Sequence, residues 1–143
     1  MNAAIDISSE VMRIMPEHVT PLWPQLQEIF APVLANSATH TDEDIRRSLM
    51  VGNSQLWAQM RGDIVEAAAT TEFVDYPKGI FVRVWLAGAK KTAKFNVDAF
   101  FEIIERWRQI NRCIGIEASG RHGWLRKFPN AKVESLVMRL TYG

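Results

Sequence analysis

The chain has 143 residues, of which 48% are hydrophobic and 23% charged, and its formal net charge is +1. A chain of this length and balance is expected to form a single domain, residues 1–143, with a real core. Its charge argues against nucleic acid as the main partner, and no apolar run approaches the roughly 18 residues that cross a membrane. The single cysteine, Cys113, excludes an intrachain disulfide. With no secretory signal visible, this favours a reducing, cytoplasmic location.

The first fifty residues predict one strand and two helices. Residues 1–9 are expected to be a loose leader, and EVMRIMP is typical of a strand ended by Pro16. Apolar side chains then recur at helical spacing, at Leu22, Leu26, Ile29, Phe30 and Val33. Thr41, followed by three acidic residues, is an N-cap signature for a second helix, which Gly52 and Asn53 end.

The pattern then changes to that of strands. SQLWAQM alternates apolar residues with Gln55 and Gln59, which predicts a strand with one wetter face. Residues 61–64 form a tight turn into IVEAAATTEF, and DYPKG is a second turn. IFVRVWLA is nearly all apolar, as expected of a central strand covered on both faces. Residues 54–87 therefore predict three antiparallel strands in a meander.

A clear amphipathic helix follows. Asn96 can cap it, five apolar side chains share one face, and Glu102 and Arg106 form an i,i+4 pair on the other. RCIGIEA then predicts a strand parallel to the last one, which makes a βαβ unit. A glycine turn at Gly120 or Gly123 leads into a short helix, HGWLRKF, and KVESLVMRLTY predicts a final strand. The expected order is β-α-α-β-β-β-α-β-α-β, an α/β (α+β) fold with a mixed central sheet.

This order of elements, from about Val11 to Tyr142, resembles the GNAT superfamily, the GCN5-related N-acetyltransferases. LWAQMRGDIVEAAATTEF looks like the second and third strands of that family, FVRVWLA like the fourth, and FFEIIERWRQINRCIGIEAS like the third helix and fifth strand. GWLRKFPNAK is similar to a later segment in which the family has an aromatic residue and a Gly-Phe. Phe128 matches the Phe, but no glycine precedes it.

The resemblance implies an acyl-CoA site. In the family, acetyl-CoA or CoA enters a cleft between strands four and five, and its pyrophosphate binds backbone amides of a glycine-rich loop before helix three. Free amides at a helix N-terminus attract anionic oxygens. At this place the chain has AGAKKTAKF, with one glycine, so the expected cofactor-binding residues are Ala87, Gly88, Ala89, Lys90 and Lys91. The lysines would supply charge in place of the glycine geometry.

The resemblance also implies a general base that takes a proton from the attacking amine. Glu66, Glu72 and Glu117 are candidates by position, and we select Glu117 and Glu72 as the expected catalytic residues. Each has a plain structural interpretation as well, because most glutamates are solvent-facing. Neither Tyr76 nor Tyr142 falls where the usual acid of the family lies, just after the fifth strand.

Two functions from different classes stay open. The first is an acyl-CoA-dependent N-acyltransferase with an amine acceptor. The second is a non-catalytic GNAT-like protein that binds a protein partner or a second copy, for example a bacteriophage virion component, since small chains with a lysine-rich loop resemble those of tailed bacteriophages. A metal site is not expected, because His18, His40 and His122 lack metal-ligand spacing. The chain also has no P-loop and no Gly-x-Ser-x-Gly motif.

Overall fold

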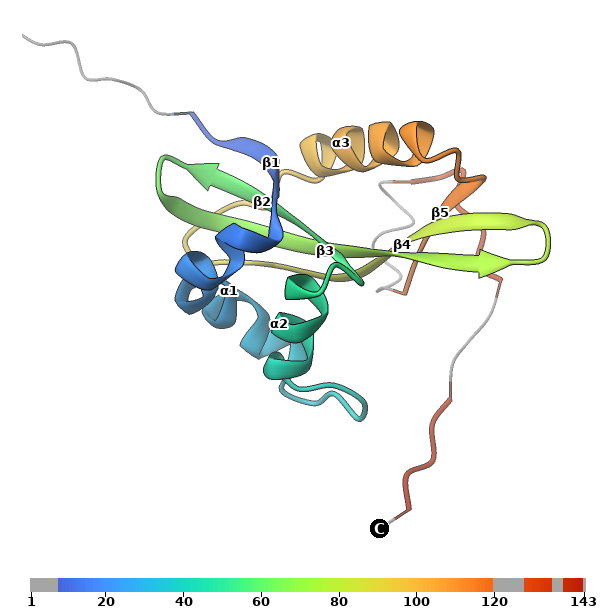
Figure 1. The fold of residues 1–143 in the computed structure, drawn as a ribbon, viewed down its shortest axis with the longest axis horizontal. Coiled ribbons are helices and arrows are strands. Elements are labelled where there is room, and N and C mark those ends of the chain that lie inside the picture. Colours follow the sequence, from blue (N-terminus) through green and yellow to red (C-terminus); the bar gives the residue numbers. More distant parts are fainter. Residues whose placement is uncertain (1–7, 120–127, 135–137, 143) are drawn as a thin grey trace, which may run out of the picture.

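A computed structural model describes residues 8–119, 128–134 and 138–142 of the chain (Figure 1). Its elements follow in the order β1 (Glu10–Ile14), a 3-10 turn (Pro16–His18), α1 (Val19–Leu34), α2 (Asp42–Met50), β2 (Gln55–Arg61), β3 (Ile64–Tyr76), β4 (Gly79–Ala89), α3 (Val97–Ile110) and β5 (Gly115–Ala118). Up to β5, this is the order that the sequence predicts.

The five strands form one mixed sheet in the order β1-β2-β3-β4-β5. Strands β1 to β4 are antiparallel to one another in sequence order, and β5 lies parallel to β4, as expected after a helical crossover. Gly62 has a φ of 58° in the turn between β2 and β3, a conformation that glycine adopts at little cost. The predicted meander and βαβ unit are therefore confirmed.

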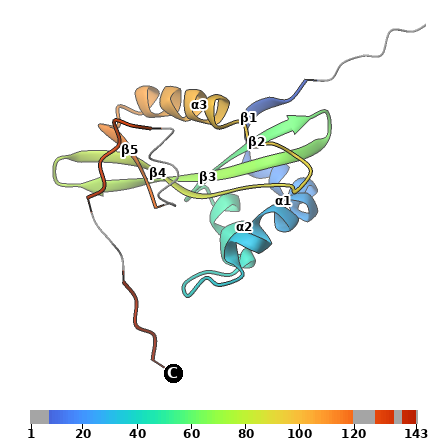
Figure 2. The ribbon, with the colours of Figure 1, turned by 180° about the vertical axis from the view of Figure 1, so that it is seen from behind.

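Helices α1 and α2 cover one face of the sheet, and α3 covers the other (Figure 1). The view from behind shows the same arrangement, with α3 on one side of the sheet and α1 and α2 on the other (Figure 2). Leu26 and Phe30 of α1 and Ile45 of α2 pack in a buried cluster with residues of β2 and β3. The capping box predicted at Thr41 is present, because its hydroxyl accepts the amide of Asp44 and the Asp44 carboxylate accepts the amide of Thr41.

A second cluster lies beneath α3. Phe100 and Ile104 pack there against Trp57, Val82 and the small side chains of β3. Asn96 caps the helix by accepting the amide of Ala99, and Arg106 donates to Glu102 at 2.6 Å, as the sequence predicts. The helix thus carries the chain from the end of β4 to the start of β5.

The prediction of a wetter face on β2 is wrong. Gln55 and Gln59 point toward the α3 side and are only 6% and 4% exposed. Both side chains form hydrogen bonds inside the protein: the amide oxygen of Gln55 accepts from the Thr71 hydroxyl, and Gln59 bonds the loop before α3. The polar face of β2 is therefore buried and hydrogen-bonded, and it is not in contact with solvent.

The end of the chain differs from expectation as far as it is described. The predicted helix HGWLRKF lies almost wholly in residues 120–127, outside the described residues. The predicted final strand falls on residues 132–142, and its described parts, 132–134 and 138–142, form neither helix nor strand. Met138, Leu140 and Tyr142 are largely exposed, so their strand-like alternation is not matched by pairing with the sheet among the described residues.

None of the helices among the described residues combines the length and the apolarity that spanning a membrane requires.

Candidate functional site

The sheet register brings the two predicted catalytic glutamates to the same arginine. Glu72 of β3 lies opposite Arg83 of β4, and Arg83 lies beside Glu117 of β5. All three point to the α1 and α2 face, because their strand neighbours Val82 and Ile116 pack under α3. The side chains therefore form a row across three strands.

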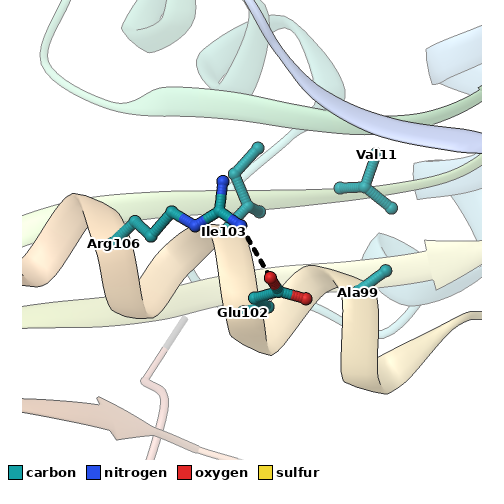
Figure 3. Close-up of a pocket in the computed structure, with 5 residues that line it drawn as sticks. All are labelled: Val11, Ala99, Glu102, Ile103 and Arg106. Carbon is teal, nitrogen blue, oxygen red and sulfur yellow. Dashed lines mark hydrogen bonds and ion pairs between the residues drawn. The ribbon is translucent and has the colours of Figure 1, made fainter.

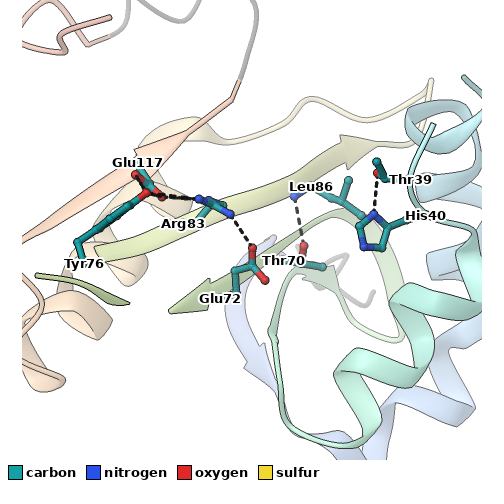
Figure 4. Close-up of polar contacts among 8 residues, drawn as sticks. All are labelled: Thr39, His40, Thr70, Glu72, Tyr76, Arg83, Leu86 and Glu117. Carbon is teal, nitrogen blue, oxygen red and sulfur yellow. Dashed lines mark hydrogen bonds and ion pairs between the residues drawn. The ribbon is translucent and has the colours of Figure 1, made fainter. Parts of the chain in front are cut away.

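Hydrogen bonds join this row to Tyr76, near the end of β3 (Figure 4). Arg83 places Nε and Nη2 each 3.0 Å from Glu117 Oε1, and its Nη1 lies 3.3 Å from Glu72 Oε1. The Tyr76 hydroxyl lies 2.9 and 3.0 Å from the two oxygens of Glu117. Glu117 is thus held by two donor groups, whereas Glu72 accepts one hydrogen bond from Arg83.

Arg83 keeps its positive charge at the centre of this network. Burial by itself would lower the pKa of its guanidinium. Hydrogen bonds with Tyr76 and Glu117, together with the charges of Glu117 and Glu72, outweigh burial and raise the pKa above its ordinary value. The four side chains are all partly exposed, so the network faces solvent beside α1 and α2.

The network lies where two strands stop pairing. Among the described residues, the last pair between β4 and β5 is Val84 with Ala118, one residue beyond Arg83 and Glu117. Strand β4 continues to Ala89, and a bulge between Thr70 and Thr71 of β3 displaces its register there. As a result, the amide of Leu86 donates to the Thr70 hydroxyl.

The loop between α1 and α2 borders the site on the side toward the end of β4 (Figure 4). The His40 ring meets Trp85 of β4 edge-on, with ring centroids 4.8 Å apart. His40 Nδ1 lies 2.8 Å from the Thr39 hydroxyl, which holds the ring in place. An aromatic pair and a carboxylate network therefore lie on the same face of β4.

Three of the predicted cofactor-binding residues, Ala87, Gly88 and Ala89, are part of β4 itself. The amide of Lys90 donates to Glu66 on β3, so strand alternation directs the amides of Ala87 and Ala89 to the opposite edge. Strand β5 lies along that edge, but among the described residues its pairing with β4 ends at Val84 and Ala118 and does not reach these amides. Gly88 lies against α1, because a Cβ there would lie 3.0 Å from the Ile29 carbonyl.

The other two, Lys90 and Lys91, begin the loop before α3. The Lys90 carbonyl accepts the Ala93 amide in a turn, and the Lys90 ammonium lies 3.4 Å from Gln25 Oε1 of α1. Lys91 is exposed. Among the described residues, the amides of Lys91, Thr92 and Lys94 meet no protein acceptor. The loop therefore offers both charge and backbone donors to an anion.

The N-terminus of α3 is less open to an anion than the resemblance implies. Asn96 already occupies the amide of Ala99, and Asp98 places a carboxylate in the first turn. A negative side chain there interacts favourably with the helix dipole, as a bound phosphate would. The turn at Lys90–Ala93 is therefore a better candidate for an anion site than the helix N-terminus.

Sequence reasoning missed Tyr76 and Arg83. The two-residue turn at Pro77 and Lys78 pairs Tyr76 with Gly79, and counting back from it pairs Glu72 with Arg83. That local signal was available in the sequence. The contact of both residues with Glu117 was not, because it depends on where β5 docks.

Other sites are weaker. Within the described ranges, no group of three or more His, Cys, Asp or Glu side chains could hold a metal ion. A shallow pocket lies between β1 and α3, lined by Val11, Ala99, Glu102, Ile103 and Arg106 (Figure 3). It lies on the α3 face of the sheet, opposite to the Glu72–Arg83–Glu117 row, and the Arg106–Glu102 ion pair crosses it.

No protein-family model matches the chain, and no curated protein matches it in sequence. Solved structures match its fold. An aminoglycoside acetyltransferase from an uncultured soil metagenomic sample has a TM-score of 0.71 at 11% identity, covering 97% of this chain and 98% of the other. A ribosomal-protein-alanine N-acetyltransferase from Brucella melitensis has 0.67 at 10%, covering 94% and 100%. An integron cassette protein of V. cholerae has 0.67 at 14%, covering 94% and 93%. The chain has the GNAT fold, in a divergent form.

Proposed function

We propose that this protein is an acyl-CoA-dependent N-acyltransferase. The observation that carries the proposal is the convergence of Glu72 and Glu117 on Arg83, one residue before the last pair of β4 with β5 among the described residues. In a GNAT fold, that divergence is where the acyl-CoA is expected to enter. The structural neighbours with acetyltransferase names, at 10–11% identity, support the choice of reaction class.

In the proposed reaction, the thioester lies along β4 beyond Val84, where no pairing on that edge is found among the described residues, and the amine approaches from the α1 and α2 face. The amine nitrogen attacks the carbonyl carbon, so that a C–N bond forms and the C–S bond breaks. Glu72 takes the proton that the amine loses, because it has free lone pairs and Glu117 is held by Tyr76 and Arg83. The thiolate takes up a proton from Tyr76, the nearby hydroxyl donor, or from water.

Titration calorimetry with CoA and acetyl-CoA tests the first step. We expect binding in the micromolar range, about −8 kcal/mol. If CoA binds, the protein would next be screened with amines, beginning with an aminoglycoside and a peptide with an N-terminal alanine. Release of the CoA thiol would be followed with a thiol-reactive dye. No heat of binding up to millimolar CoA would overturn the proposal.

Replacing Lys90 and Lys91 together by alanine should weaken CoA binding about tenfold, since each cation contributes up to about 1 kcal/mol near a pyrophosphate. The effect should shrink as salt is raised. Lys78→Ala, at the exposed turn before β4, is the matched control and should bind CoA as the wild type does. Equal affinity in the double variant and the control would remove this loop as the phosphate site.

Asp98→Asn should strengthen CoA binding about two- to fivefold, because it removes a negative charge from the first turn of α3, next to the loop. Asp75→Asn also removes one negative charge, but near the turn of the β3–β4 hairpin and away from the loop, so it should not change CoA affinity. Calorimetry at low salt would measure both. A weaker affinity in Asp98→Asn would show that Asp98 supports the loop and does not repel the ligand.

A non-catalytic role in assembly is the second candidate, and one observation favours it. Ile80, Ile110 and Ile114 are exposed at one end of the molecule, and the amide of Ile114 donates to the Ile80 carbonyl at 2.8 Å. Exposed apolar side chains of this size mark surfaces that contact other proteins. If CoA does not bind, sedimentation with and without Ile110→Lys and Ile114→Lys would show whether this end joins two copies.

A further inference from the structure

The loop that follows β4 is held in shape by a buried glutamine from another strand. Gln59 of β2 donates from its amide nitrogen to the Lys94 carbonyl at 2.9 Å, and its amide oxygen accepts the Asn96 N–H at 2.9 Å. Both groups of the side chain are thus used by the backbone of a segment 35 and 37 residues away in the sequence. Gln59 is 4% exposed, so its side-chain amide has little access to water.

This anchoring determines which loop amides are left over. The turn at Lys90–Ala93 fixes one end of the loop, and Gln59 fixes the other. Lys91 and Thr92 lie within the turn and Lys94 lies at the Gln59 contact, and the amides of all three have no acceptor among the described residues. The family motif achieves such a shape with glycines, and this loop, residues 90–96, contains none.

We propose that Gln59 is a positioning residue for CoA binding, which holds loop 90–96 in the conformation that presents its amides and lysines to the pyrophosphate. The inference rests on the proposed acyl-CoA function. Gln59 itself does not need to touch the ligand. A side chain of the same length that cannot form the two hydrogen bonds would leave the loop free to adopt other conformations, and ordering it would then oppose binding.

The strand provides a matched control. Gln55 has the same residue type, lies on the same face of β2 and is similarly buried, but it accepts its hydrogen bond from Thr71 and does not contact the loop. Gln59→Met and Gln55→Met each remove buried hydrogen bonds while nearly keeping side-chain volume. Both should lower the midpoint of thermal unfolding, so stability alone does not distinguish them.

CoA affinity does distinguish them. Gln59→Met should raise the Kd for CoA about tenfold, whereas Gln55→Met should leave it within about twofold of wild type. Pantetheine, which lacks the pyrophosphate, should bind both variants as it binds the wild type. Amide exchange at Asn96 should become faster in Gln59→Met alone, because its acceptor is gone.

The outcomes separate this inference from the function beneath it. If wild-type protein binds CoA and Gln59→Met binds it equally well, Gln59 is not a positioning residue and the inference is overturned, while the proposed function stands. If both methionine variants lose CoA and pantetheine together, the effect is a general loosening, which also overturns it. If the wild type binds no CoA, the proposed function and this inference fall together.

Discussion

Glu72→Gln is expected to lower the rate of acyl transfer about a hundredfold or more while leaving CoA affinity unchanged. A general base contributes about 10²–10⁴-fold, and glutamine keeps the shape of the side chain without its basicity. Glu72 accepts a single hydrogen bond from Arg83, so the change leaves no buried charge unpaired, since the Arg83 guanidinium still bonds Glu117. The rate of thiol release at saturating acetyl-CoA would measure the effect.

Comparison with Glu117→Gln shows which of the two glutamates is the base. Glu117 binds both Tyr76 and Arg83, so its loss should disturb the geometry of the network and lower the rate by about tenfold, less than loss of the base itself. A pH profile adds a second measure, because only removal of the base should abolish the fall in rate at low pH. If Glu117→Gln is the slower variant and loses this fall, the base is Glu117, as its place on the fifth strand suggests.

Phe30→Ala is expected to lower the free energy of unfolding by about 3–5 kcal/mol, a large part of the stability of a domain this size. Phe30 is fully buried in the cluster between α1, α2 and the sheet, so its removal leaves a cavity that the surrounding strands cannot close. Urea unfolding followed by tryptophan fluorescence would measure the loss.

Phe101→Ala is the matched control for this change. Phe101 also lies on a helix, but it is 42% exposed, and its ring packs against Phe128 at a centroid distance of 4.9 Å. We expect it to cost less than about 1.5 kcal/mol, since little apolar area is lost from water. A cost for Phe30→Ala no larger than that of the control would mean that α1 is not packed on the sheet as described.

Local signals decided most of the elements. The capping box at Thr41 depends on residues three apart, and the helix at 97–110 shows its buried face through Phe100 and Ile104. The two hairpins follow from turns of two residues, which also set the register that pairs Glu72 with Arg83. These features are predictable because the interacting groups are close in sequence.

The site needed more than local signals. The sequence by itself predicted the order of elements up to the fifth strand and offered two glutamates and the lysine loop as candidates, because periodicity, turns and composition are local properties. Only the tertiary structure decided that Glu117 reaches Arg83 and Tyr76, that Gln59 is buried and holds the loop, and that Gly88 accommodates α1. Each of these contacts joins segments far apart in the chain, and their formation depends on how the strands and helices pack together.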